Sequence, residues 1–305
     1  MTALTQLNKL QQQYGNDKHI TFEQLDNGIF LAKIDNALAT ATISLYGGHV
    51  VTWQPKSQDT PVLWCSELVQ YKPGKAIRAG VPVCWPWFGA HPTNPKAPSH
   101  GYARINNWLI DSVSTAVNGA TEICMSLCDS EHSQSQAGVM ASLSLHISIG
   151  EVFSIAMTTR NTGKETVDIT EALHAYFYVS DIAQIQISGL SACKYVDLID
   201  NNIIKTQSDT ISFSSELSRV FVNTTDECLI HDPGLSRTIK IAKTGSKTTV
   251  VWNPGIDTAT KMDDLGSSGW RKMVCVETAN ALTDIVHIEP EQQHTLTVAY
   301  SVENC

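Results

Sequence analysis

The segment 76–108 reads AIRAGVPVCWPWFGAHPTNPKAPSHGYARINNW and places the strongest constraint on the fold. Its five prolines remove backbone donors and fix φ, so it cannot form an amphipathic helix. It is not a single central strand either, because Pro82 and Pro86 would interrupt the hydrogen-bond ladder. What remains is a stiff, aromatic-rich loop with arginine and histidine at its edges. Such a loop either forms part of a binding site on a rigid scaffold or covers the end of a β core.

The rest of the chain has the pattern of short β-strands. Residues 143–149 alternate aliphatic side chains with Ser144, His146 and Ser148, which is typical of a half-buried antiparallel strand. The Gly47-Gly48 pair predicts a break between two strands within 41–53. We expect further strands at 109–117, 121–128, 139–149, 152–160, 167–179, 185–190, 194–199, 219–222, 228–231, 237–243 and 247–252, and a last pair at 272–278 and 295–302.

This pattern predicts one all-β domain, a large antiparallel sandwich or barrel, over residues 1–305. No linker, low-complexity tract or internal repeat divides it. Near the start, leucines recur at a spacing of three and Gly15 follows. Residues 2–14 are therefore predicted to form a short amphipathic helix, so that 1–15 is a peripheral segment.

The composition limits the class of partner. The formal net charge is −9 and no run of lysine or arginine occurs, which argues against nucleic acid or an anionic membrane as the main partner. Eight cysteines occur singly, without the spacing of a zinc site, so we expect reduced thiols, no metal and no cofactor. The N-terminal residues lack an apolar signal core, and we expect a cytoplasmic monomer that binds a small molecule.

Two titratable residues stand out within predicted strands. In 167–179, VDITEALHAYFYV, period two places His174 on a polar and aromatic face, which is either a sugar-binding lining or a solvent-exposed face. In 272–280, KMVCVETAN, Glu277 interrupts an apolar strand. Because burying an unpaired charge is costly, this carboxylate is either in a structural ion pair or held with a raised pKa for proton transfer.

Two motifs carry a family resemblance. Arg78-x-Gly-x-Pro-x-x-Trp-Pro-x-Phe-Gly89 and His100-Gly-x-x-Arg104 resemble the aldose 1-epimerase (mutarotase) superfamily, in particular its glucose-6-phosphate 1-epimerase branch, the hexose-6-phosphate mutarotases. The resemblance extends from about 20 to 302. It implies a large antiparallel β-sandwich with a sugar site on a concave face.

The resemblance also implies roles for individual residues. Glu277 is the base that takes the proton of the C1 hydroxyl, and His174 is the acid that protonates the ring oxygen. His100 is a second histidine in contact with the sugar. The residues themselves suggest a further role: Arg78 and Arg104 bracket the loop of an acidic chain, so they either bind a phosphate group, with which guanidinium pairs well, or form structural ion pairs with carboxylates. Asn253 and Asp264 are expected to rim the same site, and Trp85 either stacks on the sugar or fills the core, as large aromatic residues more often do.

The chain departs from the family pattern at two positions. Ala79 replaces a glycine, and Ser218 replaces an aspartate that contacts the sugar. The leading hypothesis is a hexose-6-phosphate mutarotase. The alternatives are a mutarotase for unphosphorylated or other sugars and a non-catalytic sugar-binding or regulatory protein. A glycoside hydrolase normally needs two carboxylates at the scissile bond, and only Glu277 has such a setting.

Overall fold

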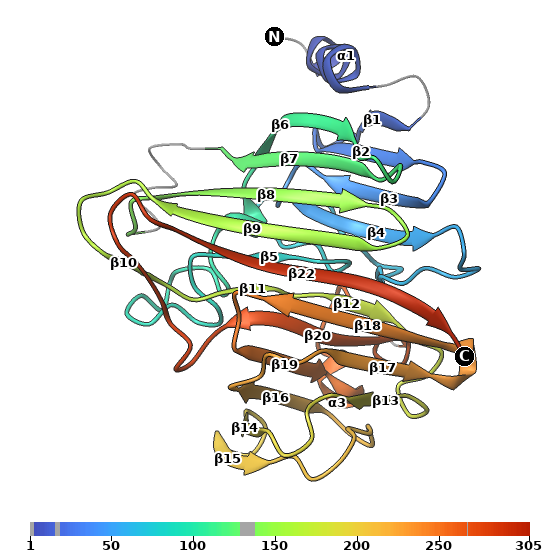
Figure 1. The fold of residues 1–305 in the computed structure, drawn as a ribbon, viewed down its shortest axis with the longest axis vertical. Coiled ribbons are helices and arrows are strands. Elements are labelled where there is room, and N and C mark those ends of the chain that lie inside the picture. The colour runs from blue at the N-terminus through green and yellow to red at the C-terminus, as the bar shows by residue number, and fades with distance from the viewer. Residues whose placement is uncertain (1–2, 16–18, 129–137, 267) are drawn as a thin grey trace.

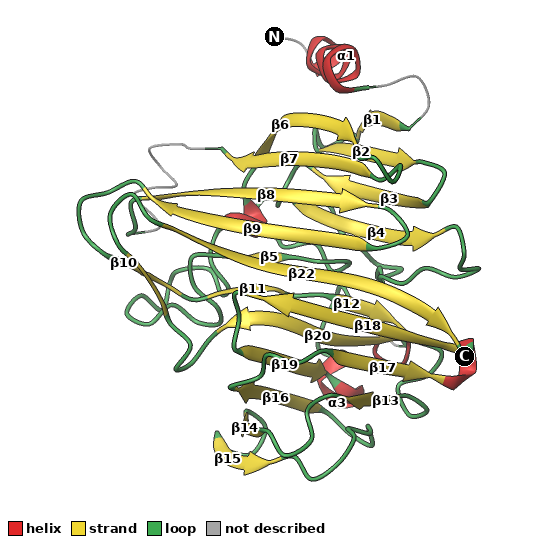
Figure 2. Cartoon of the chain, in the orientation of Figure 1, coloured by secondary structure: helices red, strands yellow, loops and turns green. Residues whose placement is uncertain are grey.

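The protein folds into two stacked layers of antiparallel strands, as a computed structural model describes for residues 3–15, 19–128, 138–266 and 268–305 (Figures 1 and 2). Its helices and strands are α1 (Ala3–Tyr14), β1 (Ile20–Gln24), β2 (Phe30–Asp35), β3 (Ala39–Ser44), β4 (His49–Pro55), β5 (Val83–Cys84), η1 (Ala103–Ile105), β6 (Trp108–Thr115), β7 (Thr121–Leu127), β8 (Ala141–Ile149), β9 (Phe153–Asn161), β10 (Val167–Ile169), β11 (Glu171–Leu173), β12 (Tyr176–Tyr178), β13 (Gln186–Ser188), β14 (Lys194–Asp197), β15 (Ile203–Thr206), β16 (Leu217–Val222), β17 (Cys228–Asp232), η2 (Pro233–Leu235), β18 (Arg237–Thr244), β19 (Thr248–Asn253), α3 (Gly255–Ala259), η3 (Gly269–Lys272), β20 (Met273–Asn280), β21 (Val286–Ile288) and β22 (Gln293–Asn304).

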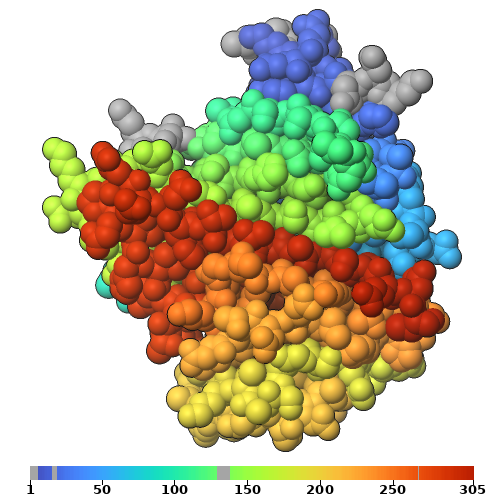
Figure 3. Space-filling view, in the orientation of Figure 1, coloured from blue at the N-terminus to red at the C-terminus, as the bar shows by residue number. Residues whose placement is uncertain are grey.

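One layer is an eight-stranded sheet in the order β13-β17-β18-β22-β9-β8-β7-β6. The other layer combines the four-stranded sheet β1-β2-β3-β4 with a second eight-stranded sheet, β15-β14-β16-β19-β20-β11-β5, in which β12 also pairs with β20. Strand β22 crosses the middle of the first layer between β9 and β18 (Figure 3). The C-terminal strand therefore pairs with strands from the middle of the sequence. This arrangement confirms the predicted all-β sandwich.

The core lies between the layers and follows from the period-two pattern. Along β8 the aliphatic side chains are buried while Ser144 and His146 are exposed. A buried indole forms a hydrogen bond across the core: the Trp53 N–H donates to the Gly150 carbonyl at 3.0 Å. Helix α1 confirms the predicted N-terminal helix, although residue 2 of the prediction lies outside the described residues. None of the described helices is long and apolar enough to span a bilayer.

The proline-rich segment 76–108 joins the second layer through its carbonyl groups. Proline lacks an N–H but keeps its carbonyl acceptor. The segment therefore accepts backbone hydrogen bonds at the edge of the sheet even at its prolines, and β5, which lies within it, ends the sheet order as expected for proline-flanked residues. The three bonds run from Thr170 N–H to Pro86 O (3.2 Å), from His174 N–H to Pro82 O (3.0 Å) and from Tyr176 N–H to Gly80 O (2.8 Å).

Two glycines allow this close packing. Gly80 has φ 46°, and a Cβ added there would lie 1.9 Å from the Val50 carbonyl oxygen. Gly101 has φ 73°, and its Cβ would lie 1.9 Å from the Trp85 carbonyl oxygen. Both positions combine a left-handed backbone with backbone contact, so only glycine fits without a shift.

The predicted single strand 167–179 is wrong in detail, because three short strands occupy it. Strand β10 pairs with β21, whereas β11 pairs with β20 and β5, and β12 pairs with β20. The chain bends at His174, where Ala175 N–H donates back to the Leu173 carbonyl. The expected alternation is therefore interrupted, although the rings of His174 and Tyr176 still stack on each other and both are buried. The two closing strands, β20 and β22, also lie in different sheets.

Glu171 in β11 is a buried carboxyl group between the layers. One carboxyl oxygen accepts from the Thr159 hydroxyl at 3.4 Å, and the other lies 3.4 Å from His294 Nε2. Burial raises the pKa of Glu171 from 4.5 to about 8, and burial also lowers the pKa of His294. Glu171 is therefore protonated in the folded chain at pH values where it is ionised in the unfolded chain.

We expect Glu171→Gln to stabilise the protein at alkaline pH. Because the folded pKa is raised, the contribution of Glu171 to stability is fully present below pH 4.5 and is lost as pH rises toward 8. Between these values the free energy of unfolding of the parent should fall relative to the variant by up to about 1.4 kcal/mol per pH unit. Urea denaturation at pH 5, 6.5 and 8 measures the difference, and parallel pH profiles would contradict it.

Candidate active site

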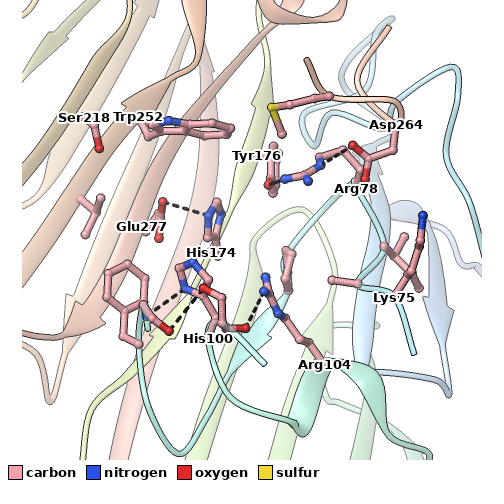
Figure 4. A pocket seen from close by; sticks show the side chains of 18 of the residues that line it. Lys75, Arg78, His100, Arg104, His174, Tyr176, Ser218, Trp252, Asp264 and Glu277 are labelled. Atoms are coloured by element: carbon pink, nitrogen blue, oxygen red, sulfur yellow. Dashed lines mark hydrogen bonds and ion pairs between the residues drawn. The ribbon is translucent and has the colours of Figure 1, made fainter. Parts of the chain in front are cut away.

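A cavity of about 660 Å³ opens on the second layer, at the edge where the segment 76–108 joins it (Figure 4). Its lining comes from this segment, from the β11–β12 bend, from β16, β19 and β20, and from the loop that follows α3. Segments far apart in the sequence therefore meet at one site. The sequence-predicted residues that it brings together are Arg78, His100, Arg104, His174, Asp264 and Glu277.

His174 and Glu277 form the centre of the cavity (Figure 4). His174 projects from the bend between β11 and β12, and Glu277 projects from β20, the strand that pairs with both. His174 Nε2 lies 3.3 Å from Glu277 Oε1, and both side chains are buried. His174 Nδ1 and Glu277 Oε2 have no protein partner in the described chain, so this pair retains unused hydrogen-bonding capacity.

Burial acts in opposite directions on this pair. It raises the pKa of Glu277 well above its usual range. It lowers the pKa of His174 well below its usual range, and the nearby His100, Arg104 and Arg78 lower this pKa further. The pair therefore holds one proton between its two members over a wide pH range. An acid and a base with a single shared proton can exchange roles without a change in net charge.

Aromatic rings fix the orientation of the imidazole. The His174 ring stacks on Tyr176 at 4.9 Å with an interplanar angle of 17°, and Trp252 meets it edge-on at 6.1 Å. A side chain held on two sides loses little further entropy when a ligand binds. These two rings were not predicted as site residues, although Tyr176 falls on the predicted His174 face.

His100 is the second imidazole of the cavity, with its ring 5.7 Å from that of His174. Its backbone has φ 60°, and its Nδ1 accepts from Gly89 N–H at 3.3 Å. Burial, with help from Arg104 and Arg78, lowers the pKa of His100 to about 3. His100 is therefore neutral at physiological pH, and its proton is on Nε2, where it can donate to a ligand.

Cationic side chains gather at one end of the cavity (Figure 4). Arg78 donates to the Tyr176 hydroxyl at 2.9 Å and to Asp264 Oδ1 at 3.2 Å. Arg104 donates to the Ser99 carbonyl at 2.7 Å, and within the described chain no carboxylate lies in salt-bridge range of it. Lys75, which the sequence analysis missed, adds a third positive charge three residues before Arg78. This end suits an anion.

The structure places Trp85 and Asn253 outside the cavity, which corrects their expected roles. Trp85 is fully buried in the core, and its indole N–H donates to the Thr159 hydroxyl at 2.9 Å. The Asn253 amide donates to the carbonyls of Trp270 and Met273, and its oxygen accepts from Gly255 N–H. Both side chains use their polar groups to hold the scaffold, and neither lines this cavity.

Cys275 lies beside the central pair, and one ligand atom from each of His174, Cys275 and Glu277 lies within 4.8 Å of the other two. Burial and the neighbouring Glu277 raise the pKa of the Cys275 thiol well above its usual range. A cation would need the thiolate, which this environment disfavours. The donor set therefore fits proton transfer by the carboxyl and imidazole better than metal binding.

Comparison with known proteins agrees with the predicted resemblance. The family model described as aldose 1-epimerase matches residues 31–301. A protein of Escherichia coli K12 named "Putative glucose-6-phosphate 1-epimerase" is 33% identical over 252 residues, 82% of this chain and 83% of that protein. A protein of Cenchrus ciliaris with the same name is 30% identical over 277 residues, 86% and 80% of the two chains. The crystal structure of a "putative mutarotase" from Salmonella typhimurium has a TM-score of 0.88 at 28% identity and covers 98% of this chain and 100% of that one.

We expect Arg104→Met to weaken the binding of inorganic phosphate by about ten- to a hundredfold, because a charge-assisted hydrogen bond contributes roughly 1.5–3 kcal/mol. Methionine keeps the apolar stem. Arg104 is a better test than Arg78, whose loss would leave Asp264 unpaired beside the anion. Isothermal titration calorimetry measures the dissociation constant. Lys240→Met, which removes a surface cation paired with Glu227, is the control, and equal affinities in all three proteins would refute the cationic site.

Proposed function

The chain belongs to the aldose 1-epimerase family, and on that premise we propose that it interconverts the α and β anomers of a hexose 6-phosphate, with glucose 6-phosphate as its main substrate. The observation that carries this proposal is the His174–Glu277 pair, 3.3 Å apart and buried, with three cationic side chains at one end of the same cavity. The names of the relatives from Escherichia coli and Cenchrus ciliaris point to the same substrate.

The proposed reaction needs an acid and a base side by side. The hydroxyl oxygen O1 and the ring oxygen O5 are both bonded to C1, so the groups that serve them must be neighbours. Glycoside hydrolysis instead needs two carboxyl groups about 5 Å or more apart, on either side of the bond. The adjacent imidazole and carboxyl group fit the first arrangement.

In the free site the opposite pKa shifts place the shared proton on Glu277, and in the proposed mechanism this proton passes to His174 Nε2, 3.3 Å away, before the sugar reacts. The Glu277 carboxylate takes the proton of the C1 hydroxyl, His174 gives its proton to O5, and the C1–O5 bond breaks to leave the open-chain aldehyde. Rotation about C1–C2 and the reverse proton transfers close the ring as the other anomer. Each positioned acid or base typically contributes about 10²–10⁴-fold. Neutral His100 donates a hydrogen bond to a sugar oxygen without adding charge.

The cationic end supports a phosphorylated substrate. A pyranose with C1 and O5 at the central pair extends its C6 substituent away from the ring, and Arg104 and Lys75 lie where a phosphate on that carbon would be neutralised. The chain carries a formal net charge of −9, so an anionic substrate requires such a local cluster. A site for free sugars would not require it.

NMR exchange spectroscopy of the two anomers tests the substrate. We expect kcat/KM for glucose 6-phosphate to exceed that for free glucose by about tenfold or more, since each charged hydrogen bond to phosphate contributes a factor of this order. Equal values would indicate a mutarotase for unphosphorylated sugars. If neither exchange is accelerated, the chain is a non-catalytic sugar-binding protein, and the proposal fails.

The roles of the central pair predict that Glu277→Gln and His174→Asn each lower kcat by about 10²–10⁴-fold. Binding should persist because both replacements are close in shape, and the fold should persist because Glu277 is uncharged when buried. Glu171→Gln is a matched control, since it makes the same change at a buried glutamate outside the cavity. Near-parental exchange in a folded Glu277→Gln or His174→Asn protein would refute the assignment.

A further inference from the structure

The two ends of the cavity differ in charge. Beyond the central pair, away from the cations, the wall consists of Phe88, Leu198, Ser218 and Val250. Figure 4 shows Ser218 on the side of Glu277 and opposite to Arg104 and Lys75. Of the two carboxyl groups that line the cavity in the described chain, Asp264 pairs with Arg78 among the cations and Glu277 lies beside this wall, where its raised pKa leaves it uncharged in the free site.

The strand register places this neutral wall beside the reacting carbon. Val250 pairs directly with Glu277, and Ser218 pairs with Trp252, which pairs with Cys275. Neighbouring strands are about 4.8 Å apart, so Ser218 lies two strand spacings, about 10 Å, from β20 on the same face. Leu198 N–H donates to the Ser218 carbonyl at 2.9 Å, which holds Leu198 next to Ser218.

The order of atoms in the ring then decides which substituent meets this wall. In a pyranose the sequence is C2–C1–O5–C5–C6. If C1 and O5 lie at Glu277 and His174 and the C6 phosphate lies at the cationic end, C2 lies on the far side of Glu277. This step rests on the proposed function. The substituent on C2 therefore faces Val250 and Ser218.

We propose that this wall is a subsite for an uncharged acylamino group on C2, so that the substrates include 2-acylamino-2-deoxyhexose 6-phosphates. The methyl end of an acetamido group packs on the side chains of Val250 and Leu198. The Ser218 hydroxyl, which lines the cavity, bonds its amide. Leu198 is 43% exposed and gains cover from such a group.

The same wall disfavours a free ammonium group on C2. In the free site Glu277 is protonated, so no ionised carboxylate of the cavity lining in the described chain faces that position, and the cations at the other end of the cavity add repulsion. A buried ammonium without a counter-charge is costly, whereas an amide needs only its hydrogen bonds. The subsite therefore separates N-acylated from free amino sugars.

Anomer exchange of three 6-phosphates by NMR tests the inference: glucose, N-acetylglucosamine and glucosamine. We expect kcat/KM for N-acetylglucosamine 6-phosphate to be within about tenfold of that for glucose 6-phosphate, and at least about tenfold above that for glucosamine 6-phosphate. Rejection of the acetamido sugar by more than a hundredfold, with normal exchange of glucose 6-phosphate, would overturn the subsite alone. No exchange of glucose 6-phosphate would overturn the proposed function instead.

Ser218→Asp should reverse the selectivity, because a carboxylate pairs with the ammonium group. We expect the ratio of kcat/KM for glucosamine 6-phosphate to that for N-acetylglucosamine 6-phosphate to rise by about tenfold or more. Ser144→Asp makes the same change at an exposed strand position outside the cavity and should leave the ratio unchanged. An unchanged ratio in folded Ser218→Asp would refute the subsite. Should Ser218→Asp not fold, Ser218→Leu supplies the test, and it must lower exchange of the acetamido sugar more than that of glucose 6-phosphate.

Discussion

Three hydrogen bonds from the strand region 170–176 to the carbonyls of Gly80, Pro82 and Pro86 determine the shape of the site. Two of these acceptors are prolines, which keep a carbonyl but have no N–H, so at Pro82 and Pro86 the segment can only accept. The middle bond holds the backbone of His174 at a bend, so its side chain leaves the plane of the sheet. The same segment supplies His100 and Arg104. The attachment of this segment to the sheet edge therefore positions the His174 and His100 imidazoles and the Arg104 guanidinium together.

The sequence predicts the scaffold well where one face of a strand is buried. Strand β8 follows its period-two pattern because only the balance between core and solvent acts on it. Residues 167–179 depart from that pattern because hydrogen bonds to distant residues, which no local window contains, break them into three strands. The helix before Gly15 is local and was accessible to sequence alone.

The candidate site was predictable in its residue types but not in its geometry. Motifs identified His174 and Glu277, yet their contact depends on the pairing of β20 with β11 and β12, about a hundred residues earlier in the chain. The role of Trp85 could not be decided from sequence, because an aromatic residue in a binding loop fills a core equally well; its complete burial and its bond to Thr159 place it in the core. Lys75 lies outside the motif, and only its position three residues before Arg78 could have suggested from sequence that it lines the site.

The contact between His174 and Glu277 has a consequence for how the proposed enzyme resets. Ring opening leaves the proton on the carboxyl group, and ring closure returns it to the imidazole, so one complete passage restores the starting state. Turnover then requires no exchange of protons with bulk water, no buffer and no second conformation of the protein. The site works equally in both directions, and it can hasten the approach to anomeric equilibrium but never displace it. A protein of this design acts as a relaxation catalyst.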